Sequence, residues 1–178
     1  MSWYEQLIDR RFSKILTAII SVSRATKETL LVNRFFKEEL INFRVVHNQI
    51  TSKSSHISGT KPLHLKELIK AGKEDLIVGI VGRVIPYKGH ADLFFGLSRL
   101  KVSVRKRIHI VVIGKGDRSE VNRLKEIARN LNISENVHFL GYVEKDPSEY
   151  IEQFDLLAMV TRTFEGFGLT ILEAIMVG

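Results

Sequence analysis

The sequence predicts an α/β fold in which helices cover both faces of a parallel sheet. Short apolar runs alternate with amphipathic segments of helix length from residue 76 to the end of the chain. The composition, with 44% hydrophobic and 26% charged residues, is that of a globular domain. A chain of 178 residues can bury roughly two thirds of the surface that it exposes when unfolded. These observations exclude disordered, collagen-like and disulfide-rich proteins.

Four apolar runs are predicted to form the strands of this sheet, namely Leu76–Val81, Ile108–Ile113, Val137–Leu140 and Leu156–Val160. The predicted helices that follow them cover residues 90–100, 121–131, 148–154 and 169–178. In the second helix, Val121, Leu124 and Ala128 recur at the three-to-four-residue spacing of one buried face. Strands that alternate with helices in this way favour a parallel sheet.

The first 75 residues follow a different pattern. Helix-like stretches at 3–16 and 25–31 flank a strand candidate, Ala18–Ser23, and a polar, linker-like stretch follows at Thr51–His56. The last predicted helix ends the chain without a further strand, so we expect an incomplete domain. The predicted organisation is a remnant of an N-terminal domain at 1–50, a linker or hinge region at 51–75, and an incomplete sheet domain at 76–178.

The chain carries 27 lysines and arginines against 20 acidic residues, and this net charge of +7 attracts phosphate groups. Its densest cationic cluster precedes a predicted strand and consists of Lys101, Arg105, Lys106 and Arg107. A solvated loop is the favoured interpretation. The cluster lacks the interleaved aromatic residues of a nucleic-acid footprint, so we expect no nucleic-acid partner. Contact with an anionic membrane surface stays open.

Several classes of protein are excluded by what the sequence lacks. It has no cysteine, which excludes thiol catalysis and cysteine-ligated zinc. Its longest apolar runs fall far below the ~20 residues of a membrane-spanning helix, and its start lacks the features of a signal peptide. We therefore expect a cytoplasmic protein, with peripheral contact at the inner face of the membrane as an open alternative.

Open parallel sheets bind ligands at the carboxyl ends of their strands, where three loops of this chain carry polar residues. The first loop runs from Gly82 to Gly89. Its Arg83 and Lys88 could converge on one diphosphate, the arginine as a planar fork and the lysine as a point charge. The alternative is an ordinary turn with two solvated cations. We expect His90 to begin the next helix as an exposed residue.

The second loop, Gly114–Ser119, is interpreted as a structural turn from strand to helix. Gly114 and Gly116 match the start of a dinucleotide-binding pattern, but Ser119 replaces its third glycine. The acidic residue that completes this pattern is also absent, because the nearest candidate, Glu135, precedes the next strand.

The third loop carries the most specific pattern in the chain, Glu-Gly-Phe-Gly from Glu165, followed by Glu173 in the next helix. It follows a predicted strand and opens a helix, so the amides of Gly168 to Thr170 are first-turn donors suited to an anion. Two glutamates would repel a phosphate, which favours hydroxyl-rich groups such as a sugar and a ribose as their ligands. The alternative is Glu165 as a helix-start carboxylate and Glu173 as an exposed helix residue.

These residues resemble the C-terminal, donor-binding domain of the retaining GT-B glycosyltransferases of family 4, also called glycosyltransferase group 1. Glu165 to Glu173 matches the Glu-x7-Glu motif of that family. Gly82-Arg83 with Lys88-Gly89 matches its Gly-Arg…Lys-Gly loop. The resemblance covers roughly residues 76–178 and implies a Rossmann-like domain, the incomplete C-terminal half of a GT-B fold.

The resemblance implies a role for each motif residue. Arg83 and Lys88 would hold the donor diphosphate, Glu165 would contact the donor sugar, and Glu173 would bind the ribose. Tyr142 and Val143 would lie against the base, largely through backbone atoms. The implied catalytic residues are Arg83, Lys88 and Glu165. The implied donor-binding residues are Gly82, Arg83, Lys88, Tyr142, Val143, Glu165, Gly166, Phe167, Gly168, Leu169, Thr170 and Glu173.

The resemblance further implies a hexosyltransferase-type enzyme that takes a nucleotide-diphosphate sugar as its donor and needs neither cofactor nor metal. The sequence agrees, because it has no Asp-x-Asp motif and no histidines at ligand spacing. Transfer would retain the anomeric configuration, with a glycan or lipid-linked acceptor bound by a domain that this chain lacks. The implied setting is polysaccharide or lipopolysaccharide biosynthesis, and we expect poor or no activity from this chain alone.

Three other interpretations stay open. The chain could be a non-catalytic nucleotide-sugar-binding module or the donor half of a split two-chain transferase. It could also be a decayed gene product that does not fold stably. The third is a phosphate-binding α/β domain of unrelated function.

Overall fold

The structure is a computed structural model, and it describes residues 16–32, 42–49, 64–144, 147–163 and 165–177. The chain divides into two compact units, which comprise residues 1–50 with 165–169 and residues 51–164 with 170–178. The predicted helix at 3–16 lies outside the described residues except for its final position. The linker-like stretch at 51–56 lies outside them altogether.

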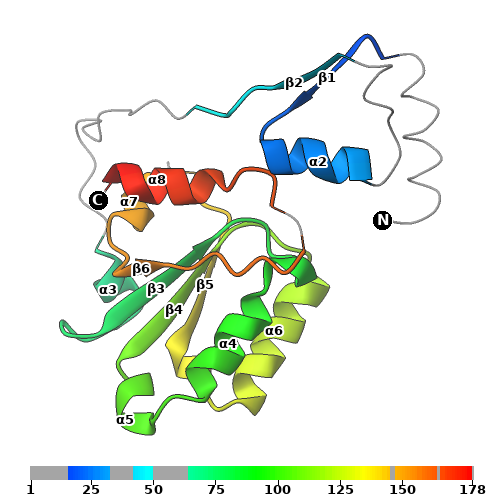
Figure 1. Cartoon of the computed structure of the whole chain (residues 1–178). Coiled ribbons are helices and arrows are strands. Elements are labelled where there is room, and N and C mark those ends of the chain that lie inside the picture. Colours follow the sequence, from blue (N-terminus) through cyan, green and yellow to red (C-terminus); the bar gives the residue numbers. More distant parts are fainter. Residues whose placement is uncertain (1–15, 33–41, 50–63, 145–146, 164, 178) are drawn as a thin grey trace. The chain divides into compact units, whose positions relative to one another are not determined.

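The larger unit is built on a four-stranded parallel sheet in the order β5-β4-β3-β6 (Figure 1). Its strands are β3 (Leu76–Val81), β4 (Ile108–Ile113), β5 (Val137–Gly141) and β6 (Leu156–Leu157). The predicted parallel sheet is therefore confirmed. β6 is shorter than the predicted run, because the chain leaves the ladder after Ala158, whose N–H still donates to Gly79 O (2.8 Å).

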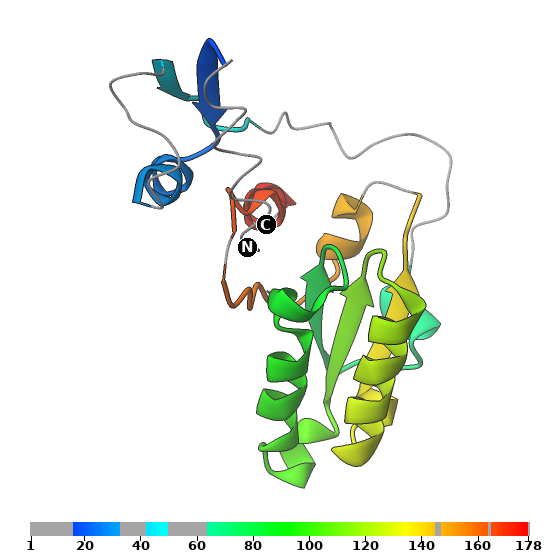
Figure 2. The same cartoon turned by 90° about the vertical axis from the view of Figure 1, so that its right-hand side faces the viewer.

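Helices cover both faces of this sheet, as predicted (Figure 2). Those of one face are α4 (His90–Ser98) and α6 (Arg118–Asn130), and those of the other are α3 (Leu65–Leu68) and α7 (Ser148–Ile151). Alternate residues of β4 point to opposite faces of the sheet. Ile110 and Val112 pack with α4 and α6, whereas Val111 and Ile113 pack with α3 and α7. Burial on both faces explains why β4 is an unbroken apolar run.

Shorter elements complete the described chain. They are η2 (Pro86–Lys88), α5 (Val102–Arg105), η3 (Ser134–Asn136) and α8 (Leu169–Val177). The cationic cluster predicted as a solvated loop contains a short helix, α5, because Arg105 Nη1 donates to Ser98 O (3.2 Å) and holds this turn against α4. Lys101, Lys106 and Arg107 are nevertheless exposed. Among the described residues, no helix is long and apolar enough to cross a bilayer.

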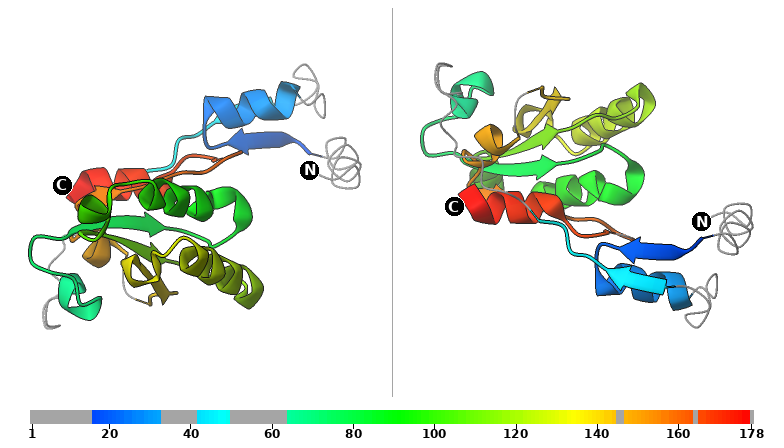
Figure 3. Two further views of the ribbon diagram at one scale, coloured as in Figure 1. Left: turned by 90° about the horizontal axis from the view of Figure 1, so that it is seen from below. Right: turned by 90° about the horizontal axis from the view of Figure 1, so that it is seen from above.

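The smaller unit contains two parallel strands, β1 (Ala18–Ser21) and β2 (Asn42–Val45), which lie side by side (Figure 3). Between them in the sequence is α2 (Arg24–Val32). Ser23 caps this helix, since its Oγ accepts the N–H of Thr26 (3.1 Å). β1 and α2 agree with predicted elements. β2 was not predicted, because its alternation of polar and apolar side chains extends over only four residues and its pairing partner, β1, is distant in the sequence.

Candidate functional site

The loops at the carboxyl edge of the larger sheet are joined by backbone hydrogen bonds. Gly82 N–H donates to Ile113 O (2.9 Å), which links the ends of β3 and β4. The N–H of Gly114 in turn donates to Gly141 O (2.8 Å), which links β4 to β5. The carboxyl ends of β3, β4 and β5 therefore lie side by side.

Glycines make this close approach of the loops possible. Gly114 has a φ of 143°, and a Cβ on it would lie 1.8 Å from Gly82 O. A Cβ on Gly116 would lie 2.6 Å from that of Val84, whose N–H donates to Lys115 O (2.8 Å). The second loop therefore packs against the first, which supports its interpretation as a structural turn.

The first loop brings both predicted cations to this edge. Arg83 is exposed, and its Nη2 donates to the hydroxyl of Tyr87 (3.2 Å). Lys88 is half-buried at the end of η2, and Gly89 follows it in the left-handed conformation (φ 75°). Val84, between the two cations in the sequence, is 1% exposed and fixes the loop to the apolar core. This combination of a buried contact and two cations suits an anionic ligand.

His90 is buried, so the expectation of an exposed helix start is wrong: the residue is 2% exposed. The reason is the phase of α4, which turns His90, Phe94 and Leu97 toward the sheet. Neither ring nitrogen has a hydrogen-bond partner among the described residues. Burial is the main cause that lowers the pKa of His90; Lys88 lowers it too, and Glu120 opposes them. A neutral imidazole therefore begins this helix.

The third loop, residues 165–169, belongs to the smaller unit. Thr26 of α2 donates through Oγ1 to Gly166 O (3.2 Å), and the rings of His47 and Phe167 lie 5.9 Å apart. Thr26 of α2 therefore holds the backbone of this loop, and His47, after β2, lies against its Phe167 ring. Sequence reasoning missed Thr26 and His47, because contacts between residues so distant in the chain leave no local pattern.

The other predicted residues of this motif lie around the start of α8. Gly168 is buried with a φ of 75°, and Leu169 is the first residue of the helix. Glu165, Thr170 and Glu173 are each half-buried. Thr170 and Glu173 belong to the larger unit, and Glu165 belongs to the smaller one. The motif therefore contributes residues to both units.

Tyr142 and Val143 follow β5 at the carboxyl edge. Tyr142 is 73% exposed, so its ring is accessible to a ligand. Val143 packs its side chain against the apolar cluster that includes Val111 and Ile113. A ligand contact by Val143 would therefore come from its backbone.

Further polar groups lie away from this edge. His109 Nδ1 and His138 Nε2 are 2.9 Å apart, and His109 Nε2 is 3.3 Å from Asp75 Oδ2. A separate hollow of about 540 Å³ is lined by Lys125, Ala128, Arg129, Ser134, Val137 and Phe139. In the part of the chain that the structure describes, no group of three or more His, Cys, Asp or Glu could hold a metal ion.

The fold matches that of solved glycosyltransferases with the GT-B fold. The structure of HepE from Anabaena in complex with UDP and glucose matches with a TM-score of 0.79 and 20% identity, over 99% of this chain and 47% of that chain. For WaaG, a glycosyltransferase involved in lipopolysaccharide biosynthesis, the TM-score is 0.71 at 21% identity, over 89% of this chain and 41% of that chain.

The family follows from the sequence match. The model of the family described as glycosyl transferases group 1 matches residues 64–178, and the chain therefore belongs to that family. Mannosylfructose-phosphate synthase of Agrobacterium fabrum is 34% identical over 113 residues, 60% of this chain and 25% of that protein. The lipopolysaccharide 1,6-galactosyltransferase of Escherichia coli is 26% identical over 163 residues, 88% of this chain and 39% of that protein. The chain thus spans less than half the length of these relatives.

Proposed function

We propose that this chain binds a nucleotide-diphosphate sugar and supplies the donor side of a retaining, family 4 glycosyltransferase. The acceptor would be a glycan or a lipid-linked saccharide, in the assembly of cell-surface polysaccharide or lipopolysaccharide. The proposed location is the cytoplasm, with peripheral contact at the inner face of the membrane. The observation that carries the proposal is the family match over residues 64–178, because this stretch contains all three motif loops. The HepE complex with UDP and glucose supports it.

Arg83 and Lys88 would hold the diphosphate of the donor. The guanidinium can donate two parallel hydrogen bonds, and the ammonium adds a point charge from the same loop. Negative charge develops on the diphosphate as the bond between its oxygen and the anomeric carbon breaks. Fixed cations therefore stabilise the transition state more than the ground state. In this proposal the two cations and the start of α8 take the place of a metal ion.

The Glu165 loop and α8 would bind the sugars of the donor. Glu165 and the backbone of Gly166–Gly168 would contact the transferred sugar. The first amides of an α-helix have no acceptor within the helix, so those of α8 would point at the ligand. Glu173, about one turn into α8, would accept hydrogen bonds from the ribose hydroxyls. Tyr142 and the backbone of Val143 would lie against the base.

Transfer would keep the anomeric configuration without a protein nucleophile. The diphosphate oxygen that leaves the anomeric carbon would accept the proton of the incoming acceptor hydroxyl. The hydroxyl oxygen would form the new bond on the face that the diphosphate leaves. The electron pair of the broken bond and the proton both end on the nucleoside diphosphate, so the task of this chain is to hold the leaving group in position.

Glutamine variants of the two motif glutamates test the assignment of sugar and ribose. Glu173→Gln should weaken binding of a nucleoside diphosphate and of its glucose conjugate equally, by about tenfold, because the ribose is common to both. Glu165→Gln should weaken only the glucose conjugate, by about the same factor. Calorimetric titration with UDP, GDP, ADP and their glucose conjugates measures both losses.

The control for this titration is Glu126→Gln, at an exposed position of α6, which should leave every affinity unchanged. Equal losses for both ligands in both variants would contradict the separate roles of Glu165 and Glu173. An unmodified chain that binds none of the six nucleotides would contradict the proposed function.

A non-catalytic nucleotide-sugar-binding module, or the donor half of a two-chain transferase, is the second candidate function. This candidate is favoured by the short length of the chain relative to known transferases, because it spans 47% of HepE and 39% of the Escherichia coli galactosyltransferase. Both candidate functions use the same donor site, and they differ in whether this chain alone transfers the sugar to an acceptor. Turnover of a nucleotide sugar by the purified chain alone would eliminate the module, whereas co-purification of an acceptor-binding chain would favour the two-chain enzyme.

A further inference from the structure

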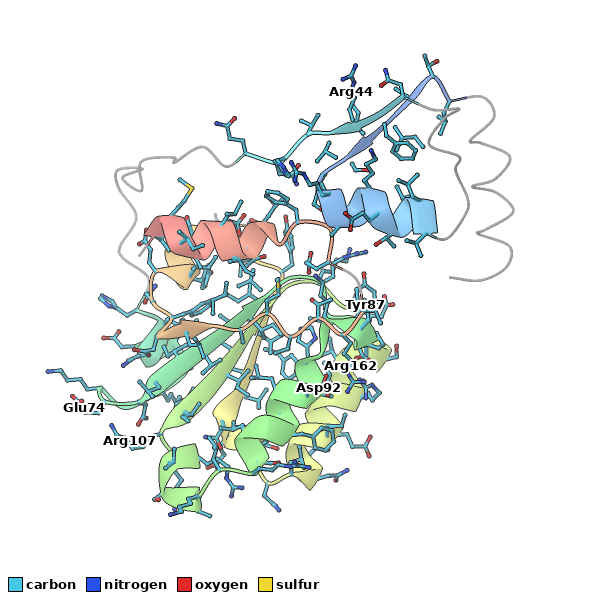
Figure 4. All side chains as sticks on the ribbon, viewed as in Figure 1. Arg44, Glu74, Tyr87, Asp92, Arg107 and Arg162 are labelled. Carbon is cyan, nitrogen blue, oxygen red and sulfur yellow. The ribbon has the colours of Figure 1, made fainter. Side chains whose placement is uncertain are left out.

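The segment that follows β6 is held to the first loop and to α4. Arg162 N–H donates to Tyr87 O (2.8 Å). A Cβ on Gly89 would lie 2.0 Å from Val160 O, so the two backbones are in direct contact there. The guanidinium of Arg162 donates two hydrogen bonds to the carboxylate of Asp92, in the first turn of α4. Figure 4 shows Tyr87, Asp92 and Arg162 grouped beside the start of α4.

The pair of Asp92 and Arg162 has the geometry of a positioning contact. Its side chains are 40% and 57% exposed, and an exposed ion pair contributes little to stability. Two parallel hydrogen bonds nevertheless fix the direction of the guanidinium plane. The hydrogen bond from Arg162 lowers the pKa of Asp92, so the carboxylate is charged at neutral pH. The N-terminus of α4 favours that negative charge as well.

The two partners lie close in the sequence to two loops of the proposed site. Asp92 is four residues after Lys88, and Arg162 is three residues before Glu165. Arg162 therefore fixes the segment that precedes the Glu165 loop in the sequence to α4, the helix that follows the loop from Gly82 to Gly89. We propose that Asp92 and Arg162 are positioning residues, which couple the diphosphate loop (residues 82–89) to the sugar loop (residues 165–169). This inference rests on the proposed donor site.

Coupling of this kind predicts a loss of affinity that depends on the sugar. Without the ion pair the segment that precedes the Glu165 loop gains conformational freedom, and the Glu165 loop must be ordered when the sugar binds. The diphosphate cations are untouched, so binding of the free nucleoside diphosphate should change little. The sugar-dependent affinity is the ratio of the affinity for the glucose conjugate to the affinity for the free nucleoside diphosphate. This ratio should fall about five- to tenfold. Arg162→Lys should show most of this loss, because it keeps the charge but not the fork.

The experiment is a titration of the whole 178-residue chain with the nucleoside diphosphate that it binds among UDP, GDP and ADP, and with the glucose conjugate of that nucleotide. Arg162→Gln and Asp92→Asn should each lose the sugar-dependent affinity. The exchanged double variant, Asp92→Arg with Arg162→Asp, should recover most of it. The matched control is Arg123→Gln, which breaks a bidentate pair with Glu120 (2.8 Å for both hydrogen bonds) inside α6 and should change neither affinity.

Thermal unfolding of each variant confirms that it is folded. Single variants that keep the full sugar-dependent affinity would overturn the coupling and leave the donor site standing. An equal loss in Arg123→Gln would also overturn it, and so would a conjugate that binds the unmodified chain no more tightly than the free diphosphate. An unmodified chain that binds none of the nucleotides would overturn the proposed function, and the coupling with it.

Discussion

Gly89 lies where the loop from Gly82, helix α4 and the segment that follows β6 meet. It ends the diphosphate loop and precedes the first residue of α4, with a φ of 75° in the left-handed region. Its missing side chain also leaves room for Val160 O, which would lie 2.0 Å from a Cβ. Both the dihedral angle and the space at this position therefore require glycine.

Gly89→Ala should lower the free energy of unfolding by about 2 kcal/mol or more, because the left-handed conformation costs an alanine about 1–2 kcal/mol and its Cβ would collide with a backbone carbonyl. Gly96 is the matched control in the same helix, where a Cβ meets nothing within 4 Å. Gly96→Ala should stabilise the chain by about 0.5–1 kcal/mol. Urea unfolding measures both variants. A Gly89→Ala chain as stable as the unmodified one would contradict this packing.

Single residues differ in how far the sequence reveals them. The position of Arg83 and Lys88 after β3 could be predicted, because they share one glycine-bracketed loop after an apolar run, whereas their role in binding stays a prediction. His90 was predicted wrongly, because its burial depends on the phase of α4 and not on its own polarity. The pairing of Asp92 with Arg162 had no signal at all, since an ion pair between distant residues leaves no periodicity or spacing to detect.

A chain of polar groups connects three strands at the amino edge of the larger sheet. Asp75 precedes β3, His109 lies in β4 and His138 lies in β5. His109 Nε2 can donate to Asp75 Oδ2, and His138 Nε2 can donate to His109 Nδ1, so that one chain of hydrogen bonds joins the three residues. Burial, assisted by His109, lowers the pKa of His138 to about 4.

The stability of the fold should therefore depend on pH through His138. From its ordinary pKa of 6.5 down to about 4, the unfolded chain binds a proton that the folded chain does not. The stability that neutral His138 contributes is thus complete above the ordinary pKa and is lost as the pH falls through this window. His138→Gln keeps a donor for His109 but does not titrate. Within this window, the slope of the unfolding free energy against pH should therefore fall by the amount that corresponds to one bound proton.

Urea unfolding across this pH window provides the measurement. His90, whose pKa is also lowered, is present in both chains, so the difference between the two profiles isolates His138. Parallel profiles for the variant and the unmodified chain would contradict the buried, neutral state of His138.

Long elements were more predictable than short ones. β3 and β4 have the predicted bounds, because each is an apolar run buried on both faces. β2 and α5 have four residues each and depend on tertiary partners, namely β1 for the strand and the carbonyl of Ser98 for the helix. Such partners are not visible in a local stretch of sequence.

The motif residues are divided between the two compact units of the chain. Residues 82–89 and 142–143 belong to the larger unit, and residues 165–169 belong to the smaller one with α2 and His47. The predicted organisation placed all of residues 76–178 in one domain, and no local pattern in the sequence indicates that residues 165–169 contact α2. Substitutions in α2, such as at Thr26, should therefore also affect the position of the loop at residues 165–169.

The proposed function requires that the loop from Gly82 to Gly89 holds the diphosphate of a nucleotide sugar. Its most direct test is calorimetric titration of Arg83→Ala and Lys88→Ala with the nucleotide sugar that the unmodified chain binds. Arg129→Ala is the matched control, because Arg129 lines the separate hollow between α6 and β5. We predict that each loop variant weakens binding by about 10- to 100-fold and that the control changes nothing. Unchanged binding in both loop variants, with a loss in Arg129→Ala, would contradict this role of the loop and place the nucleotide in that hollow.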